Sequence, residues 1–302
     1  MSTEIHGIIA YPVTPFGADG GIDTAALTGL VDTLVNTGAH AIAPLGSTGE
    51  AAYLSEDEFD TVVEATVDAV GGRVPVIVGA GDLTTANTIR RARKAEQAGA
   101  TAVMVLPVSY WKLNDREIAT HYAAIGAAIG IPIMAYNNPA TSGVDMSPEL
   151  LVQMFGDVDN LTMVKESTGD LNRMLALREL SGGQLPYYNG SNPLVLDALT
   201  AGATGWCTAA PNLRPQPCLD LYAAVRAGDT ERARVIYDEL APLLRFIVAG
   251  GLPSTVKAGL ELLGRGVGDP RRPLLPLDDA GRAELRGLLD DAGRAELRGL
   301  LG

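Results

Sequence analysis

The sequence predicts a (β/α)8 barrel with a C-terminal helical extension, and three observations lead to this fold class. Eight short apolar, β-branched runs recur along the chain, and each is followed by a segment with the apolar period of an amphipathic helix. The runs are almost continuously apolar, as strands of a parallel sheet are when helices cover its outer face. The chain has 302 residues, of which 47% are apolar, and (β/α)8 barrels of this length form one domain.

Strands and helices alternate in a regular order along the first three quarters of the chain. The predicted strands are 7–12, 41–46, 75–80, 102–107, 132–137, 162–167, 186–190 and 204–209. The predicted helices are 23–37, 55–70, 84–98, 114–129, 147–155, 170–180, 192–200 and 215–226. Several of these helices begin at residues that cap a helix N-terminus well, namely Asp23, Ser55, Thr84, Asn114 and Ser147. Eight such units in one chain favour a closed barrel over an open doubly wound sheet.

The pattern changes near residue 228, after which only helical segments follow. We therefore predict that residues 1–228 form the barrel and that 229–302 form a helical extension of the same domain. The segment DDAGRAELRGLL at 278–289 is repeated identically at 290–301. We interpret 290–302 as a duplicated tail segment and expect it to be dispensable.

Composition excludes several classes of protein. The formal net charge of −13 disfavours nucleic acid and anionic membranes as partners, because both need a basic face. The two cysteines, Cys207 and Cys218, are too few for a disulfide framework and are predicted to be buried thiols. Three histidines and two cysteines are scattered, so no metal site is expected. The sequence shows neither a signal peptide nor a long apolar span, and we expect a cytoplasmic protein.

Lys165 is unusual because it stands near the end of the predicted core strand in LTMVKESTGD. Lysine is rarely buried, so one explanation is a lysine paired with a carboxylate at the mouth of the barrel. The other is a nucleophile that forms a Schiff base with a carbonyl substrate. That reaction needs a neutral amine, and an apolar setting favours the neutral form of a lysine.

Two further features stand at the carboxyl ends of predicted strands, where the active sites of (β/α)8 barrels lie. Tyr136 closes the fifth strand, either as a half-buried aromatic residue or as a phenol that carries protons beside the lysine. The GSTGE segment 46–50 is a glycine-rich turn that could bind an anion through backbone amides and the hydroxyls of Ser47 and Thr48. Each feature is weak alone, but the combination on one barrel predicts a catalytic site.

Five segments together resemble the dihydrodipicolinate synthase/N-acetylneuraminate lyase family of class I aldolases and lyases, along nearly the whole chain. They are GIIAYPVTPF, PLGSTGE, AYNNPATSG, VKESTGD and GGLPSTVKAGLELLG. The resemblance implies a (β/α)8 TIM barrel with a three-helix C-terminal extension, a homotetramer, and no metal or organic cofactor. It implies that Lys165 forms the Schiff base and that Tyr136 is the proton shuttle. It also implies that Ser47 and Thr48 bind the carboxylate of a 2-oxo acid.

The sequence departs from the synthases of this family in three places. Those synthases carry an arginine two residues after the proline of the YN.P motif, where it binds the second substrate's carboxylate. Here Thr141 stands two residues after Pro139. Ser47 replaces a threonine that belongs to a proton relay in the synthases, and we count it among the catalytic residues. Tyr110 or Ser109 is the candidate for the tyrosine that reaches across the subunit interface.

The sequence also departs from the sialic acid lyases, which place an acidic pair after the YNG motif. This chain has Ser191, Asn192 and Pro193 there. We therefore predict a lyase for another 2-oxo acid or cyclic imine acid, acting by aldol cleavage, dehydration or deamination. A 2-keto-3-deoxy sugar acid and hydroxypyrroline carboxylate are the examples. The residues expected around the distal part of the substrate are Thr141, Ser167, Asn192 and Trp206.

Several alternatives remain open at this point. One is dihydrodipicolinate synthase or N-acetylneuraminate lyase proper. Another is a non-enzymatic barrel that binds a metabolite, although such a protein would not need Lys165 and Tyr136. A third is a phosphosugar enzyme that uses GSTGE for a phosphate. Such enzymes place the phosphate after strands seven and eight, where this chain lacks a glycine-rich helix start of the usual kind.

Overall fold

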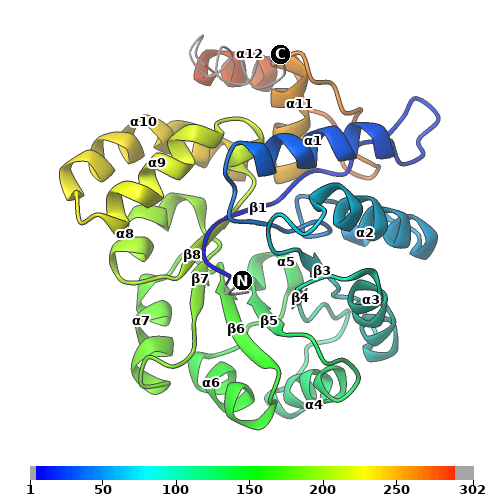
Figure 1. Ribbon diagram of the computed structural model, residues 1–302, viewed down its shortest axis with the longest axis vertical. Coiled ribbons are helices and arrows are strands. Elements are labelled where there is room, and N and C mark those ends of the chain that lie inside the picture. The colour runs from blue at the N-terminus through cyan, green and yellow to red at the C-terminus, as the bar shows by residue number, and fades with distance from the viewer. Residues whose placement is uncertain (1–4, 290–302) are drawn as a thin grey trace. The chain divides into compact units, whose positions relative to one another are not determined.

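The computed structural model describes residues 5–289, and Figure 1 shows its alternating strands and helices. Eight strands belong to one sheet in the order β2-β1-β8-β7-β6-β5-β4-β3. They are β1 Gly7–Ala10, β2 Ala41–Ile42, β3 Ile77–Gly79, β4 Ala102–Val105, β5 Ile133–Asn137, β6 Leu161–Glu166, β7 Tyr187–Asn189 and β8 Gly205–Thr208. Parallel pairing with intervening helices confirms the predicted fold class.

The helices agree closely with the predicted ranges. They are α1 Thr24–Asn36, α2 Glu56–Val70, α3 Thr85–Ala98, α4 Asp115–Gly126, α5 Pro139–Ser142, α6 Pro148–Asp157, α7 Leu171–Leu180, α8 Val195–Thr200, α9 Pro215–Arg226, α10 Thr230–Ala249, α11 Leu252–Leu262 and α12 Asp279–Leu288. All five predicted N-caps are confirmed, because each side chain accepts a hydrogen bond from the first turn. The helix predicted at 192–200 instead begins as a 3-10 turn, Asn192–Leu194, which contains a proline.

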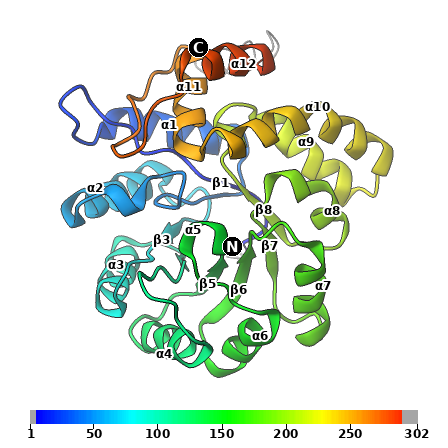
Figure 2. The ribbon, with the colours of Figure 1, turned by 180° about the vertical axis from the view of Figure 1, so that it is seen from behind.

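The chain forms two compact units. Among the described residues, one comprises 75–207 with Ile5 and His6, and the other comprises 7–74 with 208–289. In the first unit, helices α3, α4, α6 and α7 lie outside strands β4 to β7 in both views (Figures 1 and 2). The apolar residues of these strands are buried, as predicted for a sheet covered by helices.

The second unit contains the helices that follow residue 228, namely α10, α11 and α12. Helix α12 lies in the first copy of the repeated segment, and its Leu285 and the following Leu289 are buried. These leucines give the first copy a packing role. The second copy, 290–302, lies outside the described residues, and its dispensability stays a prediction. The two cysteines are buried thiols, as predicted.

No helix within residues 5–289 is long and apolar enough to cross a membrane.

A pair of charged residues in the second unit predicts how stability changes in acid. Two guanidinium nitrogens of Arg271 lie 2.6 and 2.7 Å from the carboxylate oxygens of Glu58, in the first turn of α2. The hydrogen bonds from Arg271 lower the pKa of Glu58 from 4.5 to about 2, although partial burial opposes the shift. The carboxylate therefore stabilises the fold above its unfolded pKa, and this contribution disappears as the pH falls through the folded value.

We expect Glu58→Gln to lower the free energy of unfolding by at most about 1 kcal/mol at neutral pH, because solvent screens this partly exposed pair. The difference from wild type should shrink as the pH falls from about 4.5 towards 2. Urea unfolding of both proteins across this range measures it. If the difference in unfolding free energy grew as the pH fell, the ion pair would not be the cause of the lowered pKa of Glu58.

Candidate active site

Tyr136 and Lys165 are neighbours across two adjacent strands. The parallel register of β5 and β6 sets Tyr136 opposite Lys165. Side chains alternate between the two faces of a strand, so paired residues in register present their side chains on the same face. The Nζ atom of Lys165 lies 3.8 Å from the centroid of the Tyr136 ring. The structure thus brings together the two residues that the sequence predicts to be catalytic.

Both side chains are withdrawn from solvent. Lys165 is 5% exposed and Tyr136 is 4% exposed. The strand residues on either side of Lys165, Val164 and Glu166, are fully buried. Schiff-base formation requires an amine placed beside a carbonyl carbon, and a lysine buried this deeply is rare. The predicted burial of Lys165 is confirmed.

The phenol of Tyr136 has a defined hydrogen-bond partner. Nδ2 of Asn138 donates a hydrogen bond to the Tyr136 hydroxyl oxygen at 2.9 Å. Asn138 is the residue immediately before α5, so the end of β5 supplies both the phenol and the group that orients it. An oriented phenol can exchange a proton with a substrate oxygen bound next to the lysine. Asn138 belongs to the AYNNPATSG segment, but no feature of the sequence distinguished it from the neighbouring asparagine.

A polar network supports the opposite face of the same two strands. Asn137 and Glu166 are register partners, and Nδ2 of Asn137 donates to Oε2 of Glu166 at 3.0 Å. Oε1 of Glu166 accepts from the amide of Thr168 at 2.7 Å. Arg173 lies 3.5 Å from Glu166 and 2.8 Å from Asp145, so the buried carboxylate is compensated. The network holds β5 and β6 in the register that places Tyr136 beside Lys165.

Gly190 leaves room for Lys165 and Ser167. It follows β7 directly, and its amide donates to the carbonyl of Glu166 at 2.8 Å. A Cβ at this position would lie 1.8 Å from Oγ of Ser167 and 2.8 Å from Cε of Lys165. Oγ of Ser167 is buried and has no hydrogen-bond partner among residues 5–289. Ser167 therefore has an uncommitted hydroxyl on the lysine side of the strand.

We expect Gly190→Ala to impair the lysine because the added methyl group displaces its side chain. A displacement of about 1 Å at a reacting group costs roughly 10²-fold in rate. The measurement is the rate of Schiff-base formation, trapped with borohydride. Gly156→Ala is the matched control, because no atom lies within 4 Å of the added Cβ. An unchanged rate in Gly190→Ala would show that the lysine has more space than its contacts indicate.

Two of the predicted specificity residues contact each other. Nε1 of Trp206 donates to Oδ1 of Asn192 at 3.2 Å. Trp206 is fully buried and Asn192 is 4% exposed. The indole therefore orients the Asn192 amide and exposes no surface of its own that a substrate could contact. Thr141 is exposed on α5, the short helix that follows β5. Tyr110 is 97% exposed in the segment between β4 and α4, and its place in a subunit interface stays a prediction.

The predicted carboxylate-binding residues belong to the second unit. They lie in the turn after β2, where Thr48 is buried and Ser47 is partly buried. The hydroxyl of Thr14 donates to the carbonyl of Gly49 at 2.6 Å and fixes the end of this turn. A residue outside the turn thus helps to hold it, and the role of Ser47 and Thr48 stays a prediction.

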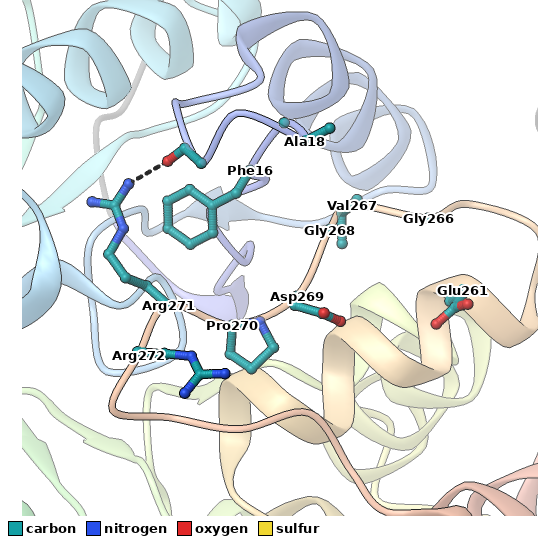
Figure 3. Close-up of a pocket in the computed structure, with 12 residues that line it drawn as sticks. Phe16, Ala18, Glu261, Gly266, Val267, Gly268, Asp269, Pro270, Arg271 and Arg272 are labelled. Carbon is teal, nitrogen blue, oxygen red and sulfur yellow. Dashed lines mark hydrogen bonds between the residues drawn. The ribbon is translucent and has the colours of Figure 1, made fainter.

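A separate pocket of about 690 Å³ lies in the second unit (Figure 3). It is lined by residues 16–18, Gly20 and residues 266–272, together with Glu261. None of the predicted catalytic residues lines it. The pocket therefore gives no reason to move the candidate site away from Lys165 and Tyr136.

Comparisons with known proteins agree over the whole chain. The model of the dihydrodipicolinate synthetase family matches residues 4–292. The 4-hydroxy-tetrahydrodipicolinate synthase of Methylobacterium radiotolerans is 36% identical over 277 residues, which cover 92% of both chains. The corresponding enzyme of Bartonella bacilliformis is 35% identical over 275 residues, covering 91% of this chain and 94% of its own.

Crystal structures extend the likeness to the fold. A Pseudomonas aeruginosa protein, provisionally described as a dihydrodipicolinate synthetase, is 57% identical, with a TM-score of 0.94 over 98% of this chain and 100% of its own. The Acinetobacter baumannii dihydrodipicolinate synthase, in complex with pyruvate, is 31% identical, with a TM-score of 0.92 over 96% of this chain and 99% of its own. These likenesses confirm the (β/α)8 barrel. The chain belongs to the dihydrodipicolinate synthetase family and is a lyase of the class that uses a lysine Schiff base.

Proposed function

We propose that Lys165 forms a Schiff base with the carbonyl carbon of a 2-oxo acid of the pyruvate type. The observation that carries this proposal is the buried pair of Lys165 and Tyr136 on adjacent strands, with 3.8 Å between Nζ and the ring centroid. The amine attacks the carbonyl carbon, and the resulting carbinolamine loses water to give an iminium. The iminium accepts the electron pair left when a proton or a carbon substituent leaves the neighbouring carbon.

In this proposal, Tyr136 moves the protons that these steps require. Its phenol donates a proton to the departing carbinolamine oxygen and recovers one from the next intermediate. The hydrogen bond from Asn138 supports this role because it orients the phenol oxygen. Ser47 and Thr48 are proposed to bind the carboxylate of the 2-oxo acid, and their turn of backbone amides and hydroxyls suits an anion.

The relatives favour a condensation as the complete reaction. The full-length matches that are 36% and 35% identical are 4-hydroxy-tetrahydrodipicolinate synthases. The Acinetobacter baumannii relative is in complex with pyruvate, so we propose pyruvate as the first substrate here. For the second substrate we propose aspartate semialdehyde, an amino acid that carries an aldehyde and whose four carbon atoms, with the three of pyruvate, give the seven of a dipicolinate. Formation of this product, the alternative in our sequence interpretation, is now the first candidate.

A specific observation keeps a different lyase as the second candidate. Thr141 occupies the position at which the sequence analysis expects an arginine in the synthases, and no arginine lies in α5. The uncommitted hydroxyl of Ser167 and the amide of Asn192 are neutral groups. Such groups suit a hydroxylated substrate, so a 2-keto-3-deoxy acid or hydroxypyrroline carboxylate is the substrate class in this case.

A substrate panel separates the two candidates. The purified protein would be given pyruvate with aspartate semialdehyde, and in parallel a set of 2-keto-3-deoxy acids and hydroxypyrroline carboxylate. Consumption of each compound would be followed by chromatography with mass detection. Condensation at a much higher kcat/KM than any cleavage would identify a synthase, whereas the reverse order would identify a degradative lyase. No turnover in a folded sample would contradict both.

We also propose that the chain is a homotetramer and that Tyr110 lies in one of its interfaces. Tyr110 and Trp111 are 97% and 77% exposed, which is unusual for adjacent aromatic residues on a monomer surface. Tyr110→Ser with Trp111→Ser should reduce the mass in sedimentation velocity. The matched control is Val235→Ser, which changes an exposed apolar residue on α10. An equal mass for all three proteins would remove this segment from the interface.

A further inference from the structure

A buried ion pair connects the C-terminal extension with the turn that carries Ser47 and Thr48. Nζ of Lys257, in α11, lies 2.7 Å from Oε1 of Glu50, the last residue of GSTGE. The two side chains are 2% and 0% exposed. Removing two charges from water is unfavourable unless they are paired closely. We therefore looked for a role that would account for burying these two charges.

The carboxylate of Glu50 is held at both oxygens by the C-terminal part of the chain. Its Oε2 accepts a hydrogen bond from the backbone amide of Arg271 at 2.7 Å. Lys257 also donates to the carbonyl of Asp269 at 3.1 Å, and its Nζ lies 4.0 Å from the centroid of the Phe16 ring. The contacts at its two oxygens restrain the Glu50 carboxylate.

Arg271 is itself fixed from several sides. Its guanidinium donates to both oxygens of Glu58 and to the backbone carbonyls of Tyr53 and Gly20. Figure 3 shows the guanidinium next to the Phe16 ring, with 4.4 Å between Cζ and the ring centroid. The backbone amide of Arg271, which donates a hydrogen bond to Glu50, is therefore held in place.

The turn that these contacts restrain has an unfavourable backbone. Leu45 and Glu50, with φ of 61° and 58°, are the two non-glycine residues of 5–289 in the left-handed region. They enclose the segment Gly46–Gly49 that carries both predicted carboxylate ligands. Residues of this kind persist only where surrounding contacts hold them. The amide of Glu50 also donates to the carbonyl of Ser47 at 3.3 Å, so a movement of Glu50 is transmitted to Ser47.

We propose that Glu50 and Lys257 are positioning residues for substrate carboxylate binding. Their ion pair holds the left-handed backbone at Glu50 and thereby sets the amides and hydroxyls of Ser47 and Thr48 for the carboxylate of the 2-oxo acid. The inference rests on the function proposed above. Through Lys257, the C-terminal extension would then contribute to substrate affinity. Lys257 itself takes no part in the chemistry.

Two variants test the pair. Lys257→Met keeps most of the side chain's volume and removes its charge, but it leaves a buried carboxylate without its cation. The double variant Glu50→Gln with Lys257→Met removes both charges, and a buried pair replaced in this way usually leaves the protein folded. Arg282→Ala is the matched control, because it breaks the Arg282–Glu261 ion pair between α11 and α12 and leaves Glu50 untouched.

The readout compares pyruvate with pyruvamide, a neutral analogue with the same reacting carbonyl. Borohydride trapping at increasing concentrations gives the half-saturating concentration of each compound. The double variant should need about tenfold more pyruvate, because charge-assisted hydrogen bonds to the carboxylate are lost. Its half-saturating concentration of pyruvamide and its maximal adduct should stay within about twofold of wild type.

Each outcome is decisive. A selective loss for pyruvate, with Arg282→Ala unchanged, supports the positioning role. Equal losses for both compounds would show a general structural role and overturn it, as would an unchanged double variant. If wild type itself forms no adduct with pyruvate, the proposed function fails, and this inference fails with it. An adduct in wild type with no change in the variants would overturn the positioning role alone.

Discussion

Lys165→Met is expected to abolish turnover of any substrate, with a loss on the order of 10³-fold or more, because the covalent intermediate cannot form without the amine. Methionine retains an unbranched side chain, so packing against Tyr136 should survive. The measurement is steady-state turnover on the best substrate of the panel, together with near-ultraviolet circular dichroism to establish the fold.

The matched control for this variant is Lys112→Met. The chain has four lysines, and Lys112 is exposed in the segment before α4. Its loss removes the same charge without touching β6 and should leave turnover within about twofold of wild type. Substantial activity in Lys165→Met would rule out a Schiff base on this residue and return Lys165 to the role of a buried structural cation.

Tyr136→Phe is expected to lower turnover by about 10²- to 10⁴-fold, the usual contribution of a positioned proton donor. The ring under Lys165 remains, and only the hydroxyl that accepts from Asn138 is removed. Binding of the 2-oxo acid carboxylate should change little, so kcat should fall much more than the half-saturating concentration changes. Rates measured over a range of substrate concentrations separate the two parameters.

Tyr187→Phe provides the comparison. Tyr187 begins β7 in the same unit, and its hydroxyl donates to the carbonyl of Ala201 at 2.8 Å. Removing this hydrogen bond should reduce stability by about 1 kcal/mol and leave kcat unchanged. Equal losses of kcat in the two variants would mean that Tyr136 supports the fold and does not transfer protons.

Local rules explain why the sequence predicted so much of the fold. The strand runs had no polar face, and the residues before the helices were good hydrogen-bond acceptors, so Ser55 and Asn114 cap helices as expected. Lys165 and Tyr136 could be selected because a lysine near the end of an apolar strand breaks the pattern. Their contact also follows from the strand order, because consecutive strands of a parallel barrel are neighbours.

Other parts of the site depend on distances that no local pattern contains. The space at Gly190 is needed because the side chain of Lys165, on the preceding strand β6, passes close to it. Glu50 lies in GSTGE and Lys257 in GGLPSTVKAGLELLG, but nothing in either segment indicates that the two side chains form an ion pair. Trp206 was expected to lie around the distal part of the substrate. Its indole N–H instead donates a hydrogen bond to the buried Asn192 and so orients that side chain.

The most direct test of the account is the intact mass of wild-type protein after incubation with pyruvate and borohydride. We expect one adduct per chain, with the mass of pyruvic acid less one oxygen atom, because imine formation releases water and the reduction adds two hydrogens. Peptide mapping should place it on Lys165 and on none of the other three lysines. An adduct on a different lysine, or none in a folded sample, would contradict the central claim that Lys165 is the Schiff-base nucleophile.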